Sequence, residues 1–472
     1  MKTFVVFALA VMHFSFSFAQ VHTRLVNNVA AYINANEATA LFNLFDSTFK
    51  EQFPLVEVER AIPSIQGGFG RISQVDSVTK KDQFLVYKLT GEKNSIYLII
   101  STGKDKDKLA SLLFSQDNPY NTIITNRDYL KTDNPLITPL EKFIDSTVKN
   151  ILSRSNTPAV SIGIIHNGKE YRYNYGETII GNKTLPNGNT VFEIGSVTKT
   201  FTGTILSRLI REKKITLEDE VNTFLPDSIK SLEFGGKKLL VKHLVNHTGT
   251  FASLIERPYG APDSEDKNNQ MKYYDKQHIF AYLNDRGLID TPGVRFRYSN
   301  LGYAILGIIC EEITGKTMST LYNEWVFTPL GMDSSFMNDE KSMGNILPYK
   351  ADGTVEAPFT LKAFGPSGSM KSTMNDMLKF MHAQLNPETK HVYKDILKTH
   401  SLLFMGQEPS MALSWFTHQN DTVIHYNHSG GTAGFASRFI FNTQHKTGVI
   451  VLSNCVNYDA NAIADVIYYS LQ

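Results

Sequence analysis

The chain has 472 residues and a mass of 53.0 kDa, which is enough for two or three domains with a sizeable core. Hydrophobic residues make up 42% and charged residues 20% of it, a globular composition that excludes wholesale disorder. The 47 basic and 46 acidic residues leave a net charge of +1, which gives a nucleic-acid partner no electrostatic support. Cys310 and Cys455 are too few for a disulfide framework or a four-cysteine zinc site, so we expect two buried free thiols.

The N-terminus predicts a secretory signal peptide. Lys2 precedes an apolar stretch over residues 4–18, and small residues at Ser17 and Ala19 prepare a cleavage site before Gln20. The stretch is too short for a spanning helix, and no later one reaches about 18 apolar residues. We therefore expect a soluble protein without a stable membrane anchor, exported to the periplasm or secreted, from which residues 1–19 are removed.

Residues 20–116 predict a small α+β domain. Apolar residues keep helical spacing over 25–49, and a shorter helical piece over 56–65 ends at a pair of glycines. Four alternating or apolar runs then predict strands at 71–78, 83–89, 95–101 and 109–114. Helices followed by a strand meander suggest a sheet curved around a helix. This order resembles the cystatin-like or NTF2-like accessory domains of exported bacterial enzymes.

The polar, irregular residues 117–136 predict an interdomain linker, and residues 137–472 predict a second domain. Its predicted elements are a helix at 141–153, strands at 159–166 and 170–175, a long helical middle, strands near 423–426, 434–442 and 448–453, and a helix at 460–471. Strands at both ends of the domain suggest one antiparallel sheet, built from both termini and covered by helices. The predicted fold class is therefore α+β.

The first candidate motif is S-x-x-K, which occurs six times, so context must choose among its copies. The serines are Ser47, Ser77, Ser101, Ser146, Ser196 and Ser264. Only Ser196 follows a glycine after an apolar run and begins a helix with an apolar stripe. There Ser196 and Lys199 share one helical face, which can place the amine beside the hydroxyl at the positive end of the helix. An ordinary serine-capped helix start is the alternative.

Two further motifs are weak when taken alone. Tyr298 and Asn300 form Y-x-N; a phenol near a lysine can have its pKa lowered and act as a base or acid, and an amide can hold a substrate carbonyl. His428 begins H-S-G-G, whose glycines Gly430 and Gly431 would let a substrate backbone approach a strand edge and complete an oxyanion hole. A packed tyrosine and a simple turn are the respective alternatives.

In this chain order the three motifs resemble the signature of the serine β-lactamase and penicillin-binding-protein superfamily, in its class C β-lactamase-like branch. That signature is S-x-x-K, then Y-x-N, then K-T-G or H-x-G. Four further segments of this chain are similar to the family, at 244–249, 291–303, 329–332 and 368–376. The resemblance covers about 137–472 and not the N-terminal domain. The letters K-T-G also occur at 446–448, but they fall in a predicted hairpin turn, whereas the H-S-G at 428–430 precedes the G-F-A-S-R strand.

The resemblance implies an exported serine hydrolase that works through an acyl-enzyme. Ser196 would attack a carbonyl, Lys199 and Tyr298 would handle its proton, and Asn300 would orient the substrate. His428 would be a fourth catalytic residue, whose neutral ring would hydrogen-bond Tyr298 and keep the proton relay. The N–H groups of Ser196 and Gly431 would bind the oxyanion. Either Lys199 or Tyr298 could be the acylation base.

The substrate stays open at this stage, among esters, β-lactams and D-amino-acid peptides. Because His428 stands where the K-T-G branch has a lysine, the case for a β-lactamase is weaker, and we expect neutral esters or amides with weak β-lactam turnover. No cofactor is implied, and His425 with His428 lacks a third ligand for a metal. The expected partner is a small-molecule or peptide substrate, with the oligomeric state undetermined. A catalytically silent binding or regulatory module is the alternative function.

Overall fold

The computed structural model describes residues 22–52, 55–81, 84–102, 105, 107–115, 130–251, 270–337, 342–357, 359–386, 391–404, 410–420 and 422–472. The chain divides into two compact units, Met1–Asn121 and Thr122–Gln472. The predicted signal peptide and residues 117–129 of the predicted linker lie outside the described residues. Within the described ranges, none of the helices combines the length and apolarity that a membrane crossing requires.

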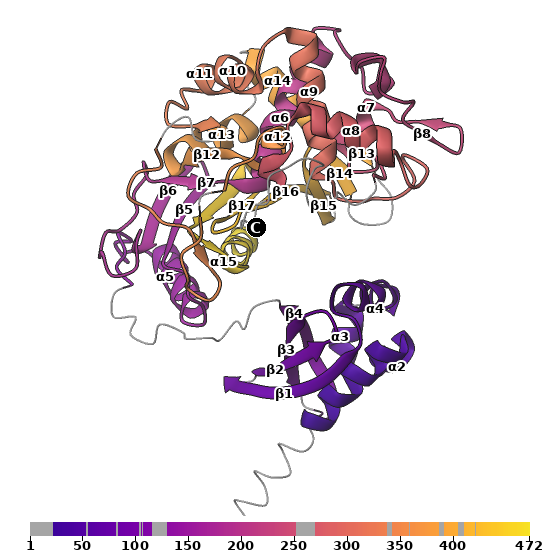
Figure 1. Ribbon diagram of the computed structural model, residues 1–472. Coiled ribbons are helices and arrows are strands. Elements are labelled where there is room, and N and C mark those ends of the chain that lie inside the picture. The colour runs from indigo at the N-terminus through magenta and orange to yellow at the C-terminus, as the bar shows by residue number, and fades with distance from the viewer. Residues whose placement is uncertain are drawn as a thin grey trace, which may run out of the picture. The chain divides into compact units, whose positions relative to one another are not determined.

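The first unit consists of helices followed by an antiparallel meander (Figure 1). Residues 22–35 are helical, and the helices after them are α2 (Ala38–Phe42), α3 (Ser47–Gln52) and α4 (Leu55–Phe69). The sheet has the order β1 (Ile72–Lys81), β2 (Phe84–Gly91), β3 (Ser95–Thr102) and β4 (Leu109–Ser115). Apolar residues of the helices and the sheet form one core, among them Val29, Ile33, Phe45, Leu89 and Leu98. The likeness of this unit to cystatin-like or NTF2-like domains stays a prediction.

The prediction of one continuous helix over residues 25–49 is wrong. The structure has three helices in this part of the chain, at 22–35, Ala38–Phe42 and Ser47–Gln52. Asn36 has a φ of 57°, a left-handed conformation that asparagine tolerates and that commonly ends a helix. Leu41 and Phe45 still reach the core, which explains why the apolar spacing looked continuous. By contrast, α4 runs through the predicted stop at Gly67 and ends at Phe69.

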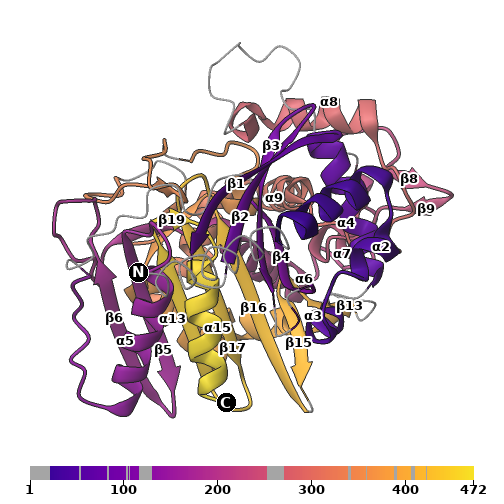
Figure 2. The same cartoon turned by 90° about the horizontal axis from the view of Figure 1, so that it is seen from below.

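The second unit is built on an eight-stranded antiparallel sheet whose strands come from both ends of the unit (Figure 2). Its strands, in spatial order, are β13 (Leu402–Phe404), β14 (Ser410–Ala412), β15 (Phe416–Asn420), β16 (Val423–Gly431), β17 (Ala436–Asn442), β18 (Thr447–Ser453), β5 (Ala159–His166) and β6 (Lys169–Gly176). The pairing of β18 with β5 joins the C-terminal strands to the N-terminal ones. The predicted α+β fold class is confirmed.

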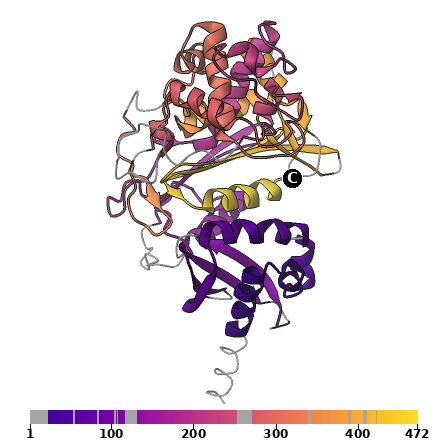
Figure 3. The ribbon, with the colours of Figure 1, turned by 45° about the vertical axis from the view of Figure 1, so that its right-hand side comes forward.

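Helices cover both faces of this sheet (Figure 3). On one face α5 (Pro139–Leu152) and α15 (Asp459–Ser470) pack on β5, β17 and β18 and bury residues such as Ile144, Val148 and Ile463. The middle of the chain lies on the other face. It contains α6 (Thr198–Arg211), α7 (Val241–Val245), α8 (Lys276–Arg286), α9 (Asn300–Thr314), α10 (Met318–Tyr322), α11 (Thr328–Leu330), α12 (Gly365–Gly368), α13 (Met374–Leu385) and α14 (His391–Thr399).

Short elements complete the second unit. A three-stranded sheet joins β10 (Phe336–Met337), β12 (Met370–Thr373) and β7 (Val191–Glu193), and smaller pairs join β8 (Glu233–Phe234) to β9 (Lys237–Lys238) and β11 (Tyr349–Lys350) to β19 (Cys455–Val456). Short helical turns are η1 (Gly195–Val197), η2 (Val221–Phe224), η3 (Gln270–Tyr273) and the π-helical η4 (Asn323–Phe327). Cys310 and Cys455 are both buried, and neither forms a disulfide, as expected.

Residues 130–136, which the sequence assigned to the linker, pack on the second unit instead. Asn134 is buried, and its Nδ2 donates to the Tyr175 hydroxyl and to the Glu141 carbonyl, each at 2.8 Å. The Gly176 N–H donates to the carbonyl of Lys131 at 2.9 Å. The second unit therefore begins no later than residue 130.

Candidate active site

Ser196 lies in the short turn η1, between strand β7 and helix α6. Gly195 has a φ of 49°, and a Cβ atom there would lie 2.5 Å from the backbone nitrogen of Gly431. A Cβ on Gly430 would lie 2.0 Å from the Ile194 carbonyl oxygen. Both glycines are therefore needed for the end of β16 to approach the turn that carries Ser196. The serine caps no helix with its side chain, since the N-terminus of α6 has no side-chain cap.

Lys199 is the central group of the site. Its side chain is completely buried in the first turn of α6. Nζ lies 3.0 Å from Ser196 Oγ, 2.8 Å from Asn300 Oδ1 and 2.6 Å from the carbonyl oxygen of Ser367. Burial lowers the pKa of this amine well below its usual 10.5, because desolvation disfavours the charged form. The neutral form of Lys199 is therefore easier to reach than that of a surface lysine.

The partners of Lys199 surround its amine with oxygen atoms. Nζ donates to Ser196 Oγ at 3.0 Å, to Asn300 Oδ1 at 2.8 Å and to the carbonyl oxygen of Ser367 at 2.6 Å. Three such acceptors match the three N–H donors of an ammonium. When the amine loses a proton, Asn300 and Ser367 can only accept, so they would keep the two remaining N–H groups and the lone pair would face Ser196. The amine thus contacts the hydroxyl from which a general base would take a proton.

Tyr298 and Asn300 reach the site from the N-terminus of α9. Ser299 caps this helix by accepting the N–H of Gly302 at 3.0 Å, which places its two neighbours on either side of the cap. The Tyr298 hydroxyl is hydrogen-bonded to Ser196, and Lys199 Nζ lies 4.8 Å from the centre of the phenol ring. The ring is 44% exposed, so the site is open to solvent on this side.

The pKa expected for Tyr298 from its neighbouring lysine is wrong. Burial of the hydroxyl raises the pKa of Tyr298 above 10, and the hydrogen bond from Ser196 only partly offsets this effect. The reason is that desolvation disfavours the charged phenolate and is the largest effect on this group. Tyr298 therefore keeps its proton and acts as a donor.

His428 lies on β16, and the strand continues through the whole H-S-G-G motif rather than turning there. Nδ1 lies 2.7 Å from the Ser429 carbonyl oxygen, which can only accept, so Nδ1 carries the proton. Nε2 is buried and has no hydrogen-bond partner among the described residues, so the hydrogen bond expected between His428 and Tyr298 is not formed. Burial, followed by the nearby Lys199, lowers the pKa of His428 to about 3. The imidazole is therefore neutral and presents an unpaired acceptor.

The structure thus brings together Ser196, Lys199, Tyr298 and Asn300, with Gly430 and Gly431 beside them. Other S-x-x-K serines lie elsewhere: Ser47 in α3, Ser77 in β1, Ser101 in β3 and Ser146 in α5, with Ser264 outside the described residues. The K-T-G letters at 446–448 lie at the end of the β17–β18 turn and the start of β18, as the strand prediction implied. In the described part of the chain, no cluster of histidine, cysteine and carboxylate side chains could hold a metal ion.

Two groups at the site carried no prediction of a role. The Ser367 carbonyl belongs to α12, and as a backbone group it leaves no side-chain signal in the sequence. His247 follows α7, is completely buried, and stacks on Tyr298 with ring centres 4.4 Å apart. Its position within the 244–249 segment was visible in the sequence, but only the fold shows what the ring touches.

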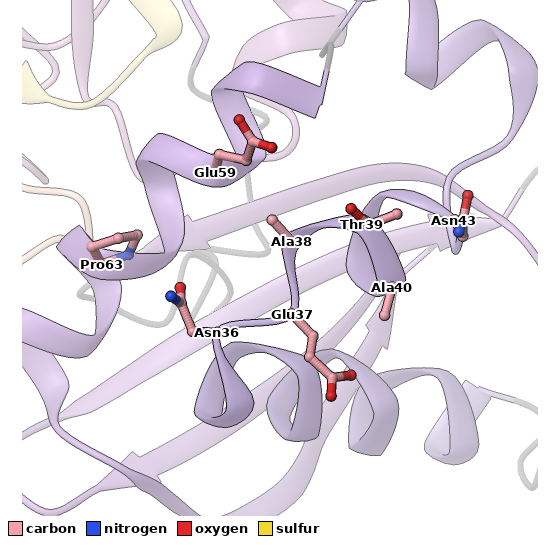
Figure 4. A pocket seen from close by; sticks show the side chains of 8 residues that line it. All are labelled: Asn36, Glu37, Ala38, Thr39, Ala40, Asn43, Glu59 and Pro63. Carbon is pink, nitrogen blue, oxygen red and sulfur yellow. The ribbon is translucent and has the colours of Figure 1, made fainter.

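A separate hollow lies in the first unit, between α2, α4 and the turn before α2 (Figure 4). Its lining residues are small or polar: Asn36, Glu37, Ala38, Thr39, Ala40, Asn43, Glu59 and Pro63. Both carboxylates, Glu37 and Glu59, are exposed, and this lining has no nucleophile with an adjacent base. The candidate active site is therefore the one around Ser196.

Comparison with known proteins places this geometry in a family. The family model described as Beta-lactamase matches residues 144–470, which contain every candidate site residue. The chain belongs to the Beta-lactamase family. The predicted superfamily is therefore confirmed.

Members of the Beta-lactamase family and their structural neighbours resemble the second unit. Protein flp of Staphylococcus aureus (strain NCTC 8325 / PS 47) is 30% identical over 330 residues, which cover 66% of this chain but only 62% of flp. A beta-lactamase of Yersinia enterocolitica is 25% identical over 348 residues, covering 66% of this chain and 86% of that protein.

Solved structures agree on the fold. The beta-lactamase/D-alanine carboxypeptidase of Yersinia pestis, complexed with citrate, superimposes with a TM-score of 0.61 at 21% identity and covers 71% of this chain and 99% of its own. The beta-lactamase/D-alanine carboxypeptidase of Pseudomonas syringae gives a TM-score of 0.62 at 19% identity, with 71% and 98% covered. At these identities the likeness establishes the fold and not the substrate.

Proposed function

We propose that this chain is an exported serine hydrolase that forms an acyl-enzyme on Ser196 and prefers neutral esters or amides. The observation that carries the proposal is the buried Lys199, whose pKa is lowered and whose Nζ lies 3.0 Å from Ser196 Oγ. A lysine of lowered pKa beside a serine hydroxyl is suited to act as the general base for that serine. Export rests on the sequence pattern of residues 1–19.

The reaction follows from these contacts. Lys199 takes the proton of Ser196 as Oγ attacks the substrate carbonyl carbon, and the amine becomes an ammonium. The carbonyl oxygen becomes an oxyanion, which the N–H groups of Ser196 and Gly431 would bind; each such donor is worth about 2.7–4 kcal/mol in comparable enzymes. Tyr298 then gives its proton to the leaving group, and the proton that Lys199 took from Ser196 passes to Tyr298, whose ring centre lies 4.8 Å from Nζ. Both groups thereby return to their starting states. Water attacks the acyl-enzyme in the second half, and the same groups work in reverse.

His428 supports the preference for neutral substrates. A β-lactam or a D-alanyl terminus presents a carboxylate, which a permanent cation would attract. His428 instead has a pKa of about 3, and its Nε2 is unprotonated. A substrate group beside Nε2 would therefore meet a lone pair and not a cation. A lone pair accepts a hydrogen bond from an N–H or O–H group and repels an anion.

The test compares kcat/KM for neutral p-nitrophenyl esters and for nitrocefin at pH 7.5. We expect the best ester to exceed nitrocefin by at least about tenfold, since one missing charge contact corresponds to about 1.4 kcal/mol. Faster turnover of nitrocefin than of any ester would contradict the proposed substrate class. Absence of turnover together with absence of labelling by a fluorophosphonate would instead indicate a catalytically silent binding module.

A further inference from the structure

The loop at residues 246–250 is hydrogen-bonded to residues 289–297, the segment that precedes Tyr298. Three backbone N–H groups of that stretch donate to carbonyl oxygens of the loop: Ile289 to Thr250 at 3.0 Å, Gly293 to Thr248 at 2.9 Å and Arg297 to His247 at 2.7 Å. The loop itself follows α7, and the Tyr303 hydroxyl of α9 donates to the α7 carbonyl of Val245 at 2.9 Å. The loop is thus tied both to α9 and to the segment before it.

His247 accepts hydrogen bonds from the backbone on both sides of Tyr298. Its carbonyl oxygen accepts the N–H of Arg297 at 2.7 Å, and its Nδ1 accepts the N–H of Ser299 at 3.1 Å. These two partners are the residues immediately before and after Tyr298. One histidine therefore fixes the backbone on both sides of the tyrosine.

The imidazole ring also supports the phenol ring. The ring centres of His247 and Tyr298 lie 4.4 Å apart with an interplanar angle of 36°. Tyr303 and Phe296 hold the imidazole in turn, at 5.2 Å and 5.7 Å. Since 44% of Tyr298 is exposed, few contacts restrain its ring, and His247 provides a close one.

The side chain of His247 makes a hydrogen bond that an apolar residue could not make. His247 has a φ of 59°, a left-handed conformation in which asparagine, aspartate and histidine are enriched. Because Nδ1 accepts a hydrogen bond, the ring proton lies on Nε2, which is buried and unpartnered among the described residues. An apolar residue would avoid the cost of that unpaired donor. Burial and then Lys199 lower the pKa of His247 well below 6.5, which keeps Nδ1 unprotonated.

We propose that His247 is a positioning residue that aims the Tyr298 hydroxyl at Ser196 and acts on the reaction only through Tyr298. This inference rests on the proposed hydrolase function. It assigns His247 no contact with the substrate, so it predicts an effect on kcat rather than on KM.

The test is a double-mutant cycle of His247→Ala and Tyr298→Phe, measured with the best neutral ester on the full chain. Misplacing a catalytic group by about 1 Å can cost about 100-fold, so His247→Ala should lower kcat by about that factor with little change in KM. In the Tyr298→Phe background the same substitution should cost less than about threefold, because no hydroxyl remains to be aimed. His247→Asn should recover most of the loss, since its Oδ1 can accept the Ser299 N–H and asparagine tolerates the left-handed backbone.

His243→Ala is the matched control. His243 is also buried and neutral, with a pKa lowered to about 4, and its Nδ1 accepts the Leu240 N–H at 3.1 Å within α7. Its loss should lower the thermal unfolding temperature and leave kcat within about threefold, as expected for a purely structural group. If His247→Ala does not fold, the cycle is run with His247→Asn. Its smaller loss of kcat should also disappear in the Tyr298→Phe background.

An equal loss in both backgrounds would overturn the inference, and so would an unchanged kcat in folded His247→Ala. Both results require a wild-type enzyme that turns over the ester. An inactive wild type that a fluorophosphonate does not label would instead refute the hydrolase function itself, so the two failures are distinguishable.

Discussion

The two units of this chain treat buried polar groups differently. In the described part of the first unit, the polar side chains that are buried are His22 and Ser101, and its core is otherwise apolar. The second unit buries an amine, several imidazoles and many hydroxyls, including Lys199, His247 and His428. Burying an ionisable group costs free energy, so such groups collect where chemistry requires them. The comparison supports placing the proposed hydrolase activity in the second unit.

The largest expected effect concerns the buried amine. Lys199→Met keeps the length and packing of the side chain but removes the amine that contacts Ser196 Oγ at 3.0 Å. General bases contribute about 10²–10⁴, so kcat/KM for the ester should fall by about 1,000-fold. Thermal unfolding by circular dichroism checks that the variant folds. A folded Lys199→Met with more than a tenth of the native kcat/KM would show that the base lies elsewhere.

Acid should destabilise the second unit through its neutral histidines. His428 has a pKa of about 3 in the folded state and about 6.5 when unfolded. Between these values the unfolded chain binds a proton that the folded chain does not, so the free energy of unfolding falls as the pH drops below about 6.5. The slope approaches about 1.4 kcal/mol per pH unit for each such group. His247 behaves in the same way, since its pKa is also lowered.

Urea unfolding of the second unit between pH 7.5 and 5 measures this slope. His428→Gln cannot gain a proton, so it should reduce the slope by about 1.4 kcal/mol per pH unit, the contribution of one group. An unchanged slope in that variant would mean that His428 is already protonated in the folded enzyme, against the electrostatic account of the site.

Substrate preference should shift when a lysine replaces the histidine of the H-S-G-G motif. His428→Lys should raise kcat/KM for nitrocefin relative to the ester by about tenfold, which corresponds to about 1.4 kcal/mol from one charge contact. His428→Gln is the neutral control and should leave the ratio near the native value. Equal shifts in both variants would assign the effect to shape rather than to charge.

The smallest effect is expected from removing the first unit. Residues 130–472 have their own cores and contain all the candidate site residues, so a fragment with these bounds should keep kcat/KM within about threefold. The shorter fragment 137–472 loses the buried contacts of Asn134 and should unfold at a lower temperature. A folded but inactive 130–472 fragment would show that the first unit takes part in catalysis.

The sequence predicted the parts of the fold whose apolar spacing is regular, such as β5, β6, β17, β18 and α15. It missed β13, β14 and β15, which are short, and the continuation of β16 through Gly431, because two glycines there read as a turn. The helix break at Asn36 was hidden because the apolar spacing resumes after it.

At the candidate site, motifs predicted which residue types assemble, but not their charge states. Spacing cannot show that Lys199 is completely buried, and burial is what lowers the pKa of Lys199 and raises that of Tyr298. The Ser367 carbonyl and the stacking of His247 arise from tertiary packing, which no local pattern encodes.

The most direct test of the central claim is to locate the covalent adduct. The full chain is treated with a fluorophosphonate, digested and mapped by mass spectrometry, beside Ser196→Ala and Ser146→Ala, the latter a second S-x-x-K serine on α5. The account predicts one adduct, on Ser196, which persists in Ser146→Ala and disappears in Ser196→Ala. Labelling that survives unchanged in Ser196→Ala would contradict it.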